Sequence, residues 1–467
     1  MDKNVNKSIK PVTHSNTGLF YKIFKLFTEI RPGEEAVTFL LMLNIFLIFT
    51  AYYIIKPVRE ALILAGKGVE FKSYLSAVMV VLLIFVVKAY SAISSRVSRQ
   101  KLISWVTIFF ISNLVIFYVF SLLGIGLGTM GIIFFVWIGI FNLMVPAQFW
   151  GFANDIFTPE AGKRLLPIVA FGATFGAFSG STIARWLVTS LGVYQMMLFS
   201  AGILVLCIFL SLIVHRIDLK KNPFRASGAE PAAVTNEHEK EKPLDKTGGF
   251  KLIFKKRYLL YIALFVLFLN FVNTNGEYML GDIASLWANN TVNAGTAAGL
   301  SLDQMIGKFY AEFFQVVNFL TLFIQLVLVS RIFKWFGVRI AVLILPIIAL
   351  GGYSLIGIGA TLAIIKWTKI LENSTDYSLM NTTRHALFLV TTREEKYKAK
   401  AAVATFFHRA GDILSALIVY LGIHHLAFNL EKFGLFNVAL VAVMLVFGFI
   451  IMREHKRITA KNSIANP

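Results

Sequence analysis

Charged side chains interrupt the long apolar stretches of this chain, and they are the residues best suited to do chemistry in it. The cations in or beside these stretches are Lys56, Arg59, Arg185, Lys308, Lys366, Lys369 and Arg409. A cation at the centre of a lipid bilayer costs at least ~2.5–3.5 kcal/mol, so it normally faces a cavity, a partner or a substrate. Several such cations in one chain therefore indicate a path for something anionic.

The first candidate site is the segment Tyr52–Glu60, in which Lys56 lies three residues before Arg59 and four before Glu60. Side chains at these spacings share one face of a helix. Because proline lacks a backbone donor, we expect the helix to kink or end at Pro57, which puts the charges at the outer end of the first span. Two interpretations stay open: an interfacial cap whose cations extend to water, or an anion site with Glu60 as counter-ion.

The second candidate site lies at the end of the fourth apolar stretch, where Phe149 and Trp150 follow Gln148 and precede Asn154. Aromatic rings together with amides suit a planar ring that has hydrogen-bonding edges. The alternative is that the rings pack in the protein or face lipid, which explains the two amides less well.

The third candidate site is the predicted span 360–383, which carries Lys369, Glu372 and Asp376 at helical spacing. A span this polar cannot face lipid, so it lines a cavity or contacts a partner helix. The Lys369–Glu372 spacing is equally consistent with an internal ion pair.

Two further spans carry charges of opposite sign. Arg409 lies three residues before Asp412, an arrangement that fits a buried pair or a gating pair, and the neighbouring His408 could relay protons. Lys308 and Glu312 lie four residues apart and are expected to pair.

Other motifs point away from catalysis. Gly172, Gly176 and Gly180 resemble a phosphate loop, but no Gly-Lys-Ser/Thr follows them, and a four-residue glycine spacing is typical of close helix packing. The single cysteine, Cys207, excludes an internal disulfide and a cysteine metal cluster. No sequence motif of a hydrolase or a metalloprotease is present, so we expect neither an enzyme nor a cofactor.

Composition places these motifs in a membrane protein. The chain has 467 residues, is 57% hydrophobic and has a mean hydropathy of +0.71, which excludes an ordinary soluble domain. A membrane-spanning helix needs ~20 mainly apolar residues. We therefore predict an all-α membrane protein with twelve transmembrane helices, at 36–55, 72–93, 102–123, 130–154, 165–188, 193–214, 258–280, 306–330, 338–357, 360–383, 399–424 and 435–452.

The net charge of +20 is distributed along one side of the predicted membrane. Lysine and arginine gather before the first span, after the last span and in alternate loops, whereas the loops near 124–129, 189–192 and 281–305 have none. Since positive loops stay in the cytoplasm, both termini are expected there. This placement argues against a nucleic-acid partner. We expect a monomer in a lipid bilayer, and the absence of a transit-like leader favours a bacterial inner membrane.

A central linker divides the chain. It is rich in proline, glutamate, lysine and alanine and poor in large apolar residues, a composition typical of linkers. The expected parts are a basic N-terminal segment 1–35, a six-helix half 36–214, the linker 215–257, a second six-helix half 258–452 and a tail 453–467.

A short repeat supports the two halves. Glu160–Lys163 precedes a helix that contains Gly176, and Glu395–Lys398 precedes a helix that contains Gly411. The second segment and the second glycine each lie 235 residues after the first. Two parallel six-helix halves with a site between them are the arrangement of the major facilitator fold.

At these motifs the sequence resembles the ATP/ADP translocase family, the nucleotide transporters of plastids and intracellular bacteria. The family's Ile-Val-Arg-x-x-Lys-Asp-x-Leu is similar to Ile54–Leu62, with each charge sign kept, and its Phe-Trp-x-Phe-Ala-Asn is similar to Phe149–Asn154. Its Ala-Lys-Arg-x-x-Pro resembles Gly162–Pro167. Late in the chain, Asp376–His385 resembles Lys-Tyr-Ser-Leu-Phe-Asp-Pro-Thr-Lys-Glu, and Lys398–Ala402 resembles Lys-Gly-Lys-Ala-Ala.

The resemblance implies a transporter of major facilitator type that exchanges ATP for ADP, or takes up related nucleotides, by alternating access. Two positions depart from the family: Asp376 replaces a lysine, and the acid of the seventh span has only Glu277 as a candidate counterpart. Ammonium and guanidinium groups bind phosphates strongly, so the expected phosphate contacts are Lys56, Arg59, Lys369 and Arg409. The expected neighbours of the base are Phe149, Trp150 and Asn154, and the expected counter-ions or gating residues are Glu60, Glu277, Glu372, Asp376 and Asp412.

Other functions stay open at this point. A proton-coupled carrier of another organic or phosphorylated anion would use Asp376, Asp412 and His408 as its relay. A membrane sensor or scaffold does not need an anion-attracting path, so the polar spans argue against it. A lipid flippase or an exporter is also compatible with the sequence.

Overall fold

The computed structural model of the protein describes residues 31, 33–94, 97, 99–124, 127–221, 249–392 and 394–465. Nine helical segments within these ranges are long and apolar enough to cross a membrane. Most of the predicted N-terminal segment 1–35 and the core of the predicted linker 215–257 lie outside the described residues, as do the last two residues of the tail.

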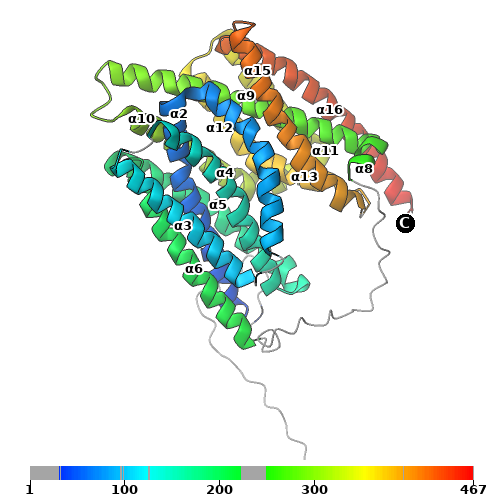
Figure 1. The fold of residues 1–467 in the computed structure, drawn as a ribbon. Helices are drawn as coiled ribbons and strands as arrows, with labels where there is room; N and C mark the ends of the chain where they lie inside the picture. Colours follow the sequence, from blue (N-terminus) through cyan, green and yellow to red (C-terminus); the bar gives the residue numbers. More distant parts are fainter. Residues whose placement is uncertain are drawn as a thin grey trace, which may run out of the picture.

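The described chain is helical almost throughout (Figure 1). The N-terminal group consists of α2 (Glu35–Ser94), α3 (Arg99–Leu122), α4 (Leu127–Ile156), α5 (Pro159–Ser190) and α6 (Gln195–Lys221). After the short α8 (Gly249–Lys255), the C-terminal group consists of α9 (Arg257–Asn293), α10 (Leu302–Phe323), η1 (Ile324–Leu328), α11 (Val329–Ile358), α12 (Leu362–Thr375), η2 (Asp376–Met380), α13 (Asn381–Leu387), η3 (Glu395–Ala399), α14 (Lys400–Ala402), η4 (Val403–Phe407), α15 (His408–His424) and α16 (Leu430–Ala465). The η elements are π-helical turns.

Two of the long helical segments are broken by a glycine. Gly68 in α2 has φ 83° and Gly337 in α11 has φ 71°, a conformation that is unfavourable for residues with a Cβ atom. Each glycine ends one helix, and the next helix begins directly after it. Hydropathy and length alone therefore count the two helices as one segment. The predicted span 360–383 is not one of the nine apolar segments, because it carries too many charges, but it is helical from Leu362 to Leu387 except for a π turn.

Of the kink or end expected at Pro57, the end is wrong. The helix continues through Pro57 and reaches Gly68. A proline inside a membrane helix is tolerated where neighbouring groups satisfy the freed backbone carbonyl. As a result, the charged cluster lies inside a helix and is buried, with Lys56 8% and Glu60 1% exposed. The interfacial cap is therefore excluded.

The glycine stripe of α5 lies against α2. A Cβ atom at Gly176 would come within 2.2 Å of the Phe46 carbonyl oxygen, and one at Gly172 or Gly180 would come within 2.5 Å of a carbonyl oxygen of α2. In α15, a Cβ atom at Gly411 would lie 2.7 Å from the backbone nitrogen of Phe271 on α9. This confirms the packing interpretation, and it shows that both glycines of the sequence repeat serve the same purpose.

The ends of the same helices are also joined by ion pairs. Arg164 near the start of α5 lies 2.9 Å from Glu34, just before α2, and Arg31 lies 2.6 Å from Glu160. In the C-terminal group, Lys256 precedes α9 and lies 3.7 Å from Glu395. The helix starts are thus paired in the same way in both groups.

Candidate substrate site

A cavity of about 280 Å³ lies between the N-terminal and C-terminal groups. Side chains from α2, α4, α9, α10, η2 and α15 line it, and we call it the central cavity. The charged residues in its wall are Lys56, Arg59, Lys72, Glu277, Arg409 and Asp412. Both groups therefore supply charges to one space, as expected for an anion site.

One carboxylate on the N-terminal wall holds two cations. Glu60 Oε1 accepts a hydrogen bond from Arg59 Nε at 2.9 Å, and Glu60 Oε2 lies 2.7 Å from Lys72 Nζ. Pairing of this kind offsets the cost of burying a charge. Glu60 is therefore a counter-ion, as its place in the sequence predicted, and this triad retains a net positive charge.

Lys56 is held differently. Four aromatic rings surround its ammonium: Phe314 at 4.0 Å, Tyr53 at 4.8 Å, Tyr377 at 5.8 Å and Tyr52 at 5.9 Å from nitrogen to centroid. The faces of such rings attract a cation without neutralising its charge. Within the described chain, Lys56 has neither an ion pair nor a hydrogen bond from its side chain. Its charge is thus free to attract an anion in the central cavity.

Lys369 is enclosed by the C-terminal group and does not line the central cavity. It is fully buried, and its ammonium lies 2.8 Å from Glu372, 3.6 Å from Glu277 and 2.7 Å from the side-chain oxygen of Asn273. The internal ion pair with Glu372 is confirmed. The expected phosphate contact is not supported, because two carboxylates already surround this cation and Glu277 is the member that faces the cavity.

Close packing fixes this buried network. Tyr353 donates a hydrogen bond to Glu372 at 2.7 Å, and Asn373 donates one to Glu277 at 3.0 Å. A Cβ atom at Gly276 would lie 2.1 Å from the Tyr353 hydroxyl and 2.8 Å from the Lys369 side chain. The glycine before Glu277 is therefore what allows the lysine to reach its partners.

Arg409 and Asp412 form the pair that their spacing predicted, at 3.3 Å, and both line the central cavity. Asp412 also accepts hydrogen bonds from Asn270 at 2.7 Å and Thr274 at 2.9 Å. The carboxylate is thus held by α9, whereas the Arg409 side chain is 42% exposed. This leaves Arg409 as a cation that can turn toward a bound anion.

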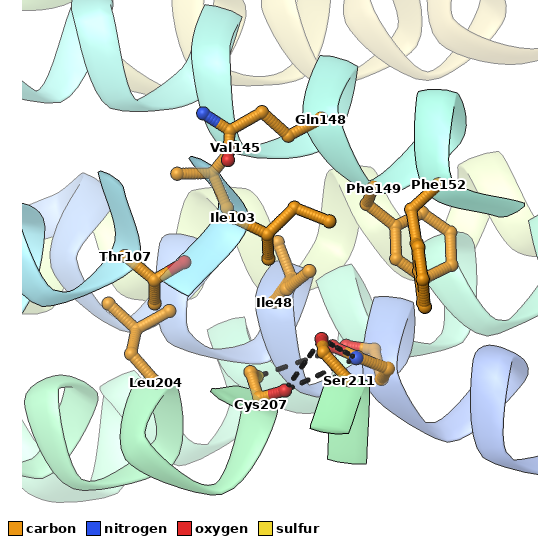
Figure 2. Close-up of a pocket in the computed structure, with 11 residues that line it drawn as sticks. Ile48, Ile103, Thr107, Val145, Gln148, Phe149, Phe152, Leu204, Cys207 and Ser211 are labelled. Atoms are coloured by element: carbon orange, nitrogen blue, oxygen red, sulfur yellow. Dashed lines mark hydrogen bonds between the residues drawn. The ribbon is translucent and has the colours of Figure 1, made fainter. Parts of the chain in front are cut away.

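The residues expected near a base do not reach the central cavity. Phe149 and Gln148 line a separate cavity of about 20 Å³ among α2, α3, α4 and α6, beside the hydrogen-bonded Asn44 and Ser211 (Figure 2). Trp150 is half-buried and Asn154 is exposed close to the end of α4. Their role beside a base stays a prediction, because a motif shows which residues lie near each other along a helix but not which cavity they face.

Two other expected contacts are also different. Glu312 lies 3.5 Å from Arg185 and 3.9 Å from Lys366, so the expected pair with Lys308 is not formed. Asp376 lies 3.4 Å from Arg384 and lines a neighbouring cavity of about 380 Å³ instead of the central one.

Lys72 is the main functional residue that the sequence did not reveal. It stands at the first position of a predicted span, where a charge is usually an interfacial cap. The signal that could have found it is Gly68, because a glycine that starts a new helix puts Lys72 one turn inside that helix, opposite Glu60.

Two sequence comparisons agree with the motifs. The family model described as TLC ATP/ADP transporter matches residues 130–360. The "ADP,ATP carrier protein 2" of Chlamydia pneumoniae is 24% identical over 316 residues, which are 59% of this chain and 56% of that protein. The match thus spans little more than half the length of this relative.

Solved structures share the fold at low sequence identity. A peptide transporter POT in complex with sulfate matches with a TM-score of 0.59 and 13% identity, over 94% of this chain and 98% of that chain. The nucleoside transporter NupG matches with a TM-score of 0.56 and 11% identity, over 89% of this chain and 98% of that chain. The fold of the described chain is thus similar to that of these helical membrane transporters. The two sequence comparisons support the ATP/ADP translocase family, the family that the motifs indicated, over about half of the chain.

Proposed function

We propose that this protein is a nucleotide transporter, which exchanges ATP and ADP or takes up a related nucleotide by alternating access. The observation that carries the proposal is Lys56, a cation in the wall of the central cavity that forms no ion pair with any described residue. The triad of Arg59, Glu60 and Lys72 lies beside it and adds positive charge. Several cations around one cavity suit the several charges of a nucleotide's phosphates.

The proposal includes twelve membrane spans in two halves. The nine apolar segments become eleven when the breaks at Gly68 and Gly337 are counted, and the charged helix Leu362–Leu387 is the twelfth. The N-terminal group then supplies six spans and the C-terminal group six. The matching glycine contacts and ion pairs of the two groups support this division.

We infer that the structure represents a state closed at the outer end of the two groups. His424 Nε2 lies 2.6 Å from Glu70 Oε1, and Arg185 lies 3.2 Å from Gln315, each contact joining the two groups. Glu70 and His424 lie at helix ends that the loop charges place outside the cell. Transport would open these contacts and close the opposite end around the same central cavity.

Exchange follows from the charge of the cavity. An empty protein that closes around Lys56 must bury a cation that has no counter-ion, which is unfavourable. A bound anion supplies that counter-ion and makes the change of state easier. Each inward step would then need one anion and each outward step another.

The test uses purified protein in liposomes that are either empty or preloaded with ADP, with uptake of labelled ATP as the measurement. The wild-type protein should take up ATP only into preloaded liposomes. Lys56→Ala should reduce uptake by roughly 10- to 150-fold, the equivalent of the ~1.5–3 kcal/mol of a charge-assisted hydrogen bond. Lys67→Ala, an exposed position on the same element, is the matched control. Equal uptake into empty liposomes would rule out obligate exchange, and full activity of Lys56→Ala would remove Lys56 from the site.

A proton-coupled carrier is the second candidate. His408 lies in the walls of both the central cavity and its neighbour, with Asp412 in one wall and Asp376 in the other. A relay along these three groups would link the two cavities. In that case an imposed pH gradient would drive uptake into liposomes that contain no nucleotide.

A further inference from the structure

The 380 Å³ cavity beside the central cavity has no role in the phosphate site described above. We call it the side cavity, and the residues that matter for its chemistry are Phe49, Tyr53, Asp376, Tyr377, Asn381 and Arg384. Tyr377 and His408 belong to the walls of both cavities. The two spaces are therefore neighbours that share these two side chains in their walls.

Two rings stand between the free cation and the side cavity. Tyr53 and Tyr377 both line the side cavity, and their centroids lie 4.8 Å and 5.8 Å from the Lys56 ammonium. A molecule that places an anionic group on Lys56 would therefore extend past two tyrosine rings into the side cavity. Aromatic rings in such a position stack on a planar heterocycle.

The polar groups of the side cavity can form hydrogen bonds with the edge of a planar heterocycle. Asp376 Oδ1 is buried and pairs with the Arg384 guanidinium at 3.4 Å, but within the described residues it accepts no hydrogen bond. Asn381 adds an exposed amide, whereas the amide of Asn318 is already bonded to Ala177 and Ser181. A carboxylate oxygen with one ion pair and no hydrogen bond can still accept a hydrogen bond from an amino group, such as the exocyclic amino group of adenine, guanine or cytosine.

The backbone presents these residues through an irregular helix. Asp376 and Tyr377 begin the π turn η2, which follows α12 directly. A π turn inserts an extra residue into a helix, and such turns are frequent at functional sites. Asp376 thereby faces only the side cavity, and the adjacent Tyr377 borders both cavities.

We propose that the side cavity holds the nucleobase of a bound nucleotide, while Lys56 and Arg59 hold its phosphates. Tyr53 and Tyr377 flank the base, and Asp376 accepts a hydrogen bond from its amino group. This inference rests on the proposed nucleotide transport. It adds a binding site for the nucleobase, which the central cavity does not provide. It also gives the base a place that Phe149 and Trp150 do not provide.

The experiment fills the side cavity and leaves the phosphate site intact. Thr174 is half-buried in α5 and lines the side cavity but not the central one. Equilibrium binding of labelled ATP to the purified Thr174→Trp protein is measured, together with its displacement by inorganic tripolyphosphate and by unlabelled ATP. Direct calorimetry with tripolyphosphate alone follows on each variant. Lys56→Ala is the contrasting variant, and Lys67→Ala is the control for a change outside both cavities.

We expect Thr174→Trp to weaken ATP binding by roughly 5- to 150-fold, which corresponds to losing the ~1–3 kcal/mol of one stacked base. Tripolyphosphate affinity should stay unchanged, and this also shows that the variant is folded. Lys56→Ala should weaken both ligands. Tyr53→Leu, which removes one flanking ring, should weaken ATP more than it weakens tripolyphosphate.

The possible failures are distinguishable. Unchanged ATP binding by Thr174→Trp, or an equal loss of ATP and tripolyphosphate in Tyr53→Leu, would overturn the base site and leave nucleotide transport standing. A wild-type protein that binds tripolyphosphate as tightly as ATP would also overturn it. A wild-type protein that binds and transports no nucleotide would overturn the proposed function together with this inference.

Discussion

The triad around Glu60 makes a strong prediction for stability, because one buried carboxylate there serves two cations. Replacing it in Glu60→Gln removes the negative charge and keeps the shape of the side chain. Arg59 and Lys72 then remain close together with no counter-ion, and Lys72 is 7% exposed. Leaving a buried charge without its partner typically costs ~3–5 kcal/mol. We expect a loss of this size, and a correspondingly lower Tm.

The assay is thermal unfolding of the purified protein in detergent, followed by intrinsic fluorescence. Glu160→Gln is the matched control, because it removes a carboxylate from an exposed pair whose side chains are 69% and 62% exposed. Such pairs contribute little to stability. The double variant Glu60→Gln with Lys72→Met should recover part of the loss, because it removes one of the two unpaired cations. If Glu60→Gln unfolds at the same temperature as Glu160→Gln, the buried triad is refuted.

Three more predictions follow from packing and from the contacts between the groups. Gly176→Ala should prevent assembly into a monodisperse protein on size-exclusion chromatography, because its Cβ atom would meet a carbonyl of α2 at 2.2 Å, whereas Gly202→Ala has open space and should behave like the wild type. Gly276→Ala should lower both Tm and uptake, since its Cβ atom would collide with a tyrosine hydroxyl at 2.1 Å; an unchanged protein would contradict the buried lysine network. Glu70→Ala should loosen the outer contact between Glu70 and His424, which measures 2.6 Å. A reporter cysteine introduced by Ser76→Cys in the central cavity should then react several-fold faster with a membrane-impermeant reagent added outside. Equal rates with and without Glu70→Ala would show that this contact does not hold the outer end closed.

The positions of the helices could be predicted from the sequence because most of them face lipid. Apolar runs mark such helices regardless of what they pack against. The ends of helices were less predictable: α9 continues to Asn293, although hydropathy ends the span near residue 280. The outer turns of that helix carry polar residues, which lower the hydropathy without breaking the helix. The first helix shows the same effect, since its charges suggested an end where the helix continues.

The candidate site could be predicted only where its contacts lie on one helix. The pairs Arg409–Asp412 and Lys369–Glu372 follow from a spacing of three residues, and both are formed. The ion pair between Lys72 and Glu60 depends instead on how two helices meet at the break at Gly68. Spacing along the chain also cannot tell whether a cation faces a cavity or is enclosed, which is why Lys369 was expected to bind phosphate.

The π turns have a consequence for how the C-terminal group could change its shape. All four π turns of the described residues lie in this group: η1 in the segment between α10 and α11, η2 at the side cavity, and η3 and η4 before α15. A π turn contains one residue more than an α turn, so shifting it along a helix rotates the intervening side chains by ~100° while both helix ends stay in place. Such a register shift at η2 would rotate Tyr377, which borders both cavities, relative to each of them. The C-terminal group could then swap the side chains that face the substrate while every one of its spans keeps its length and its place in the bilayer.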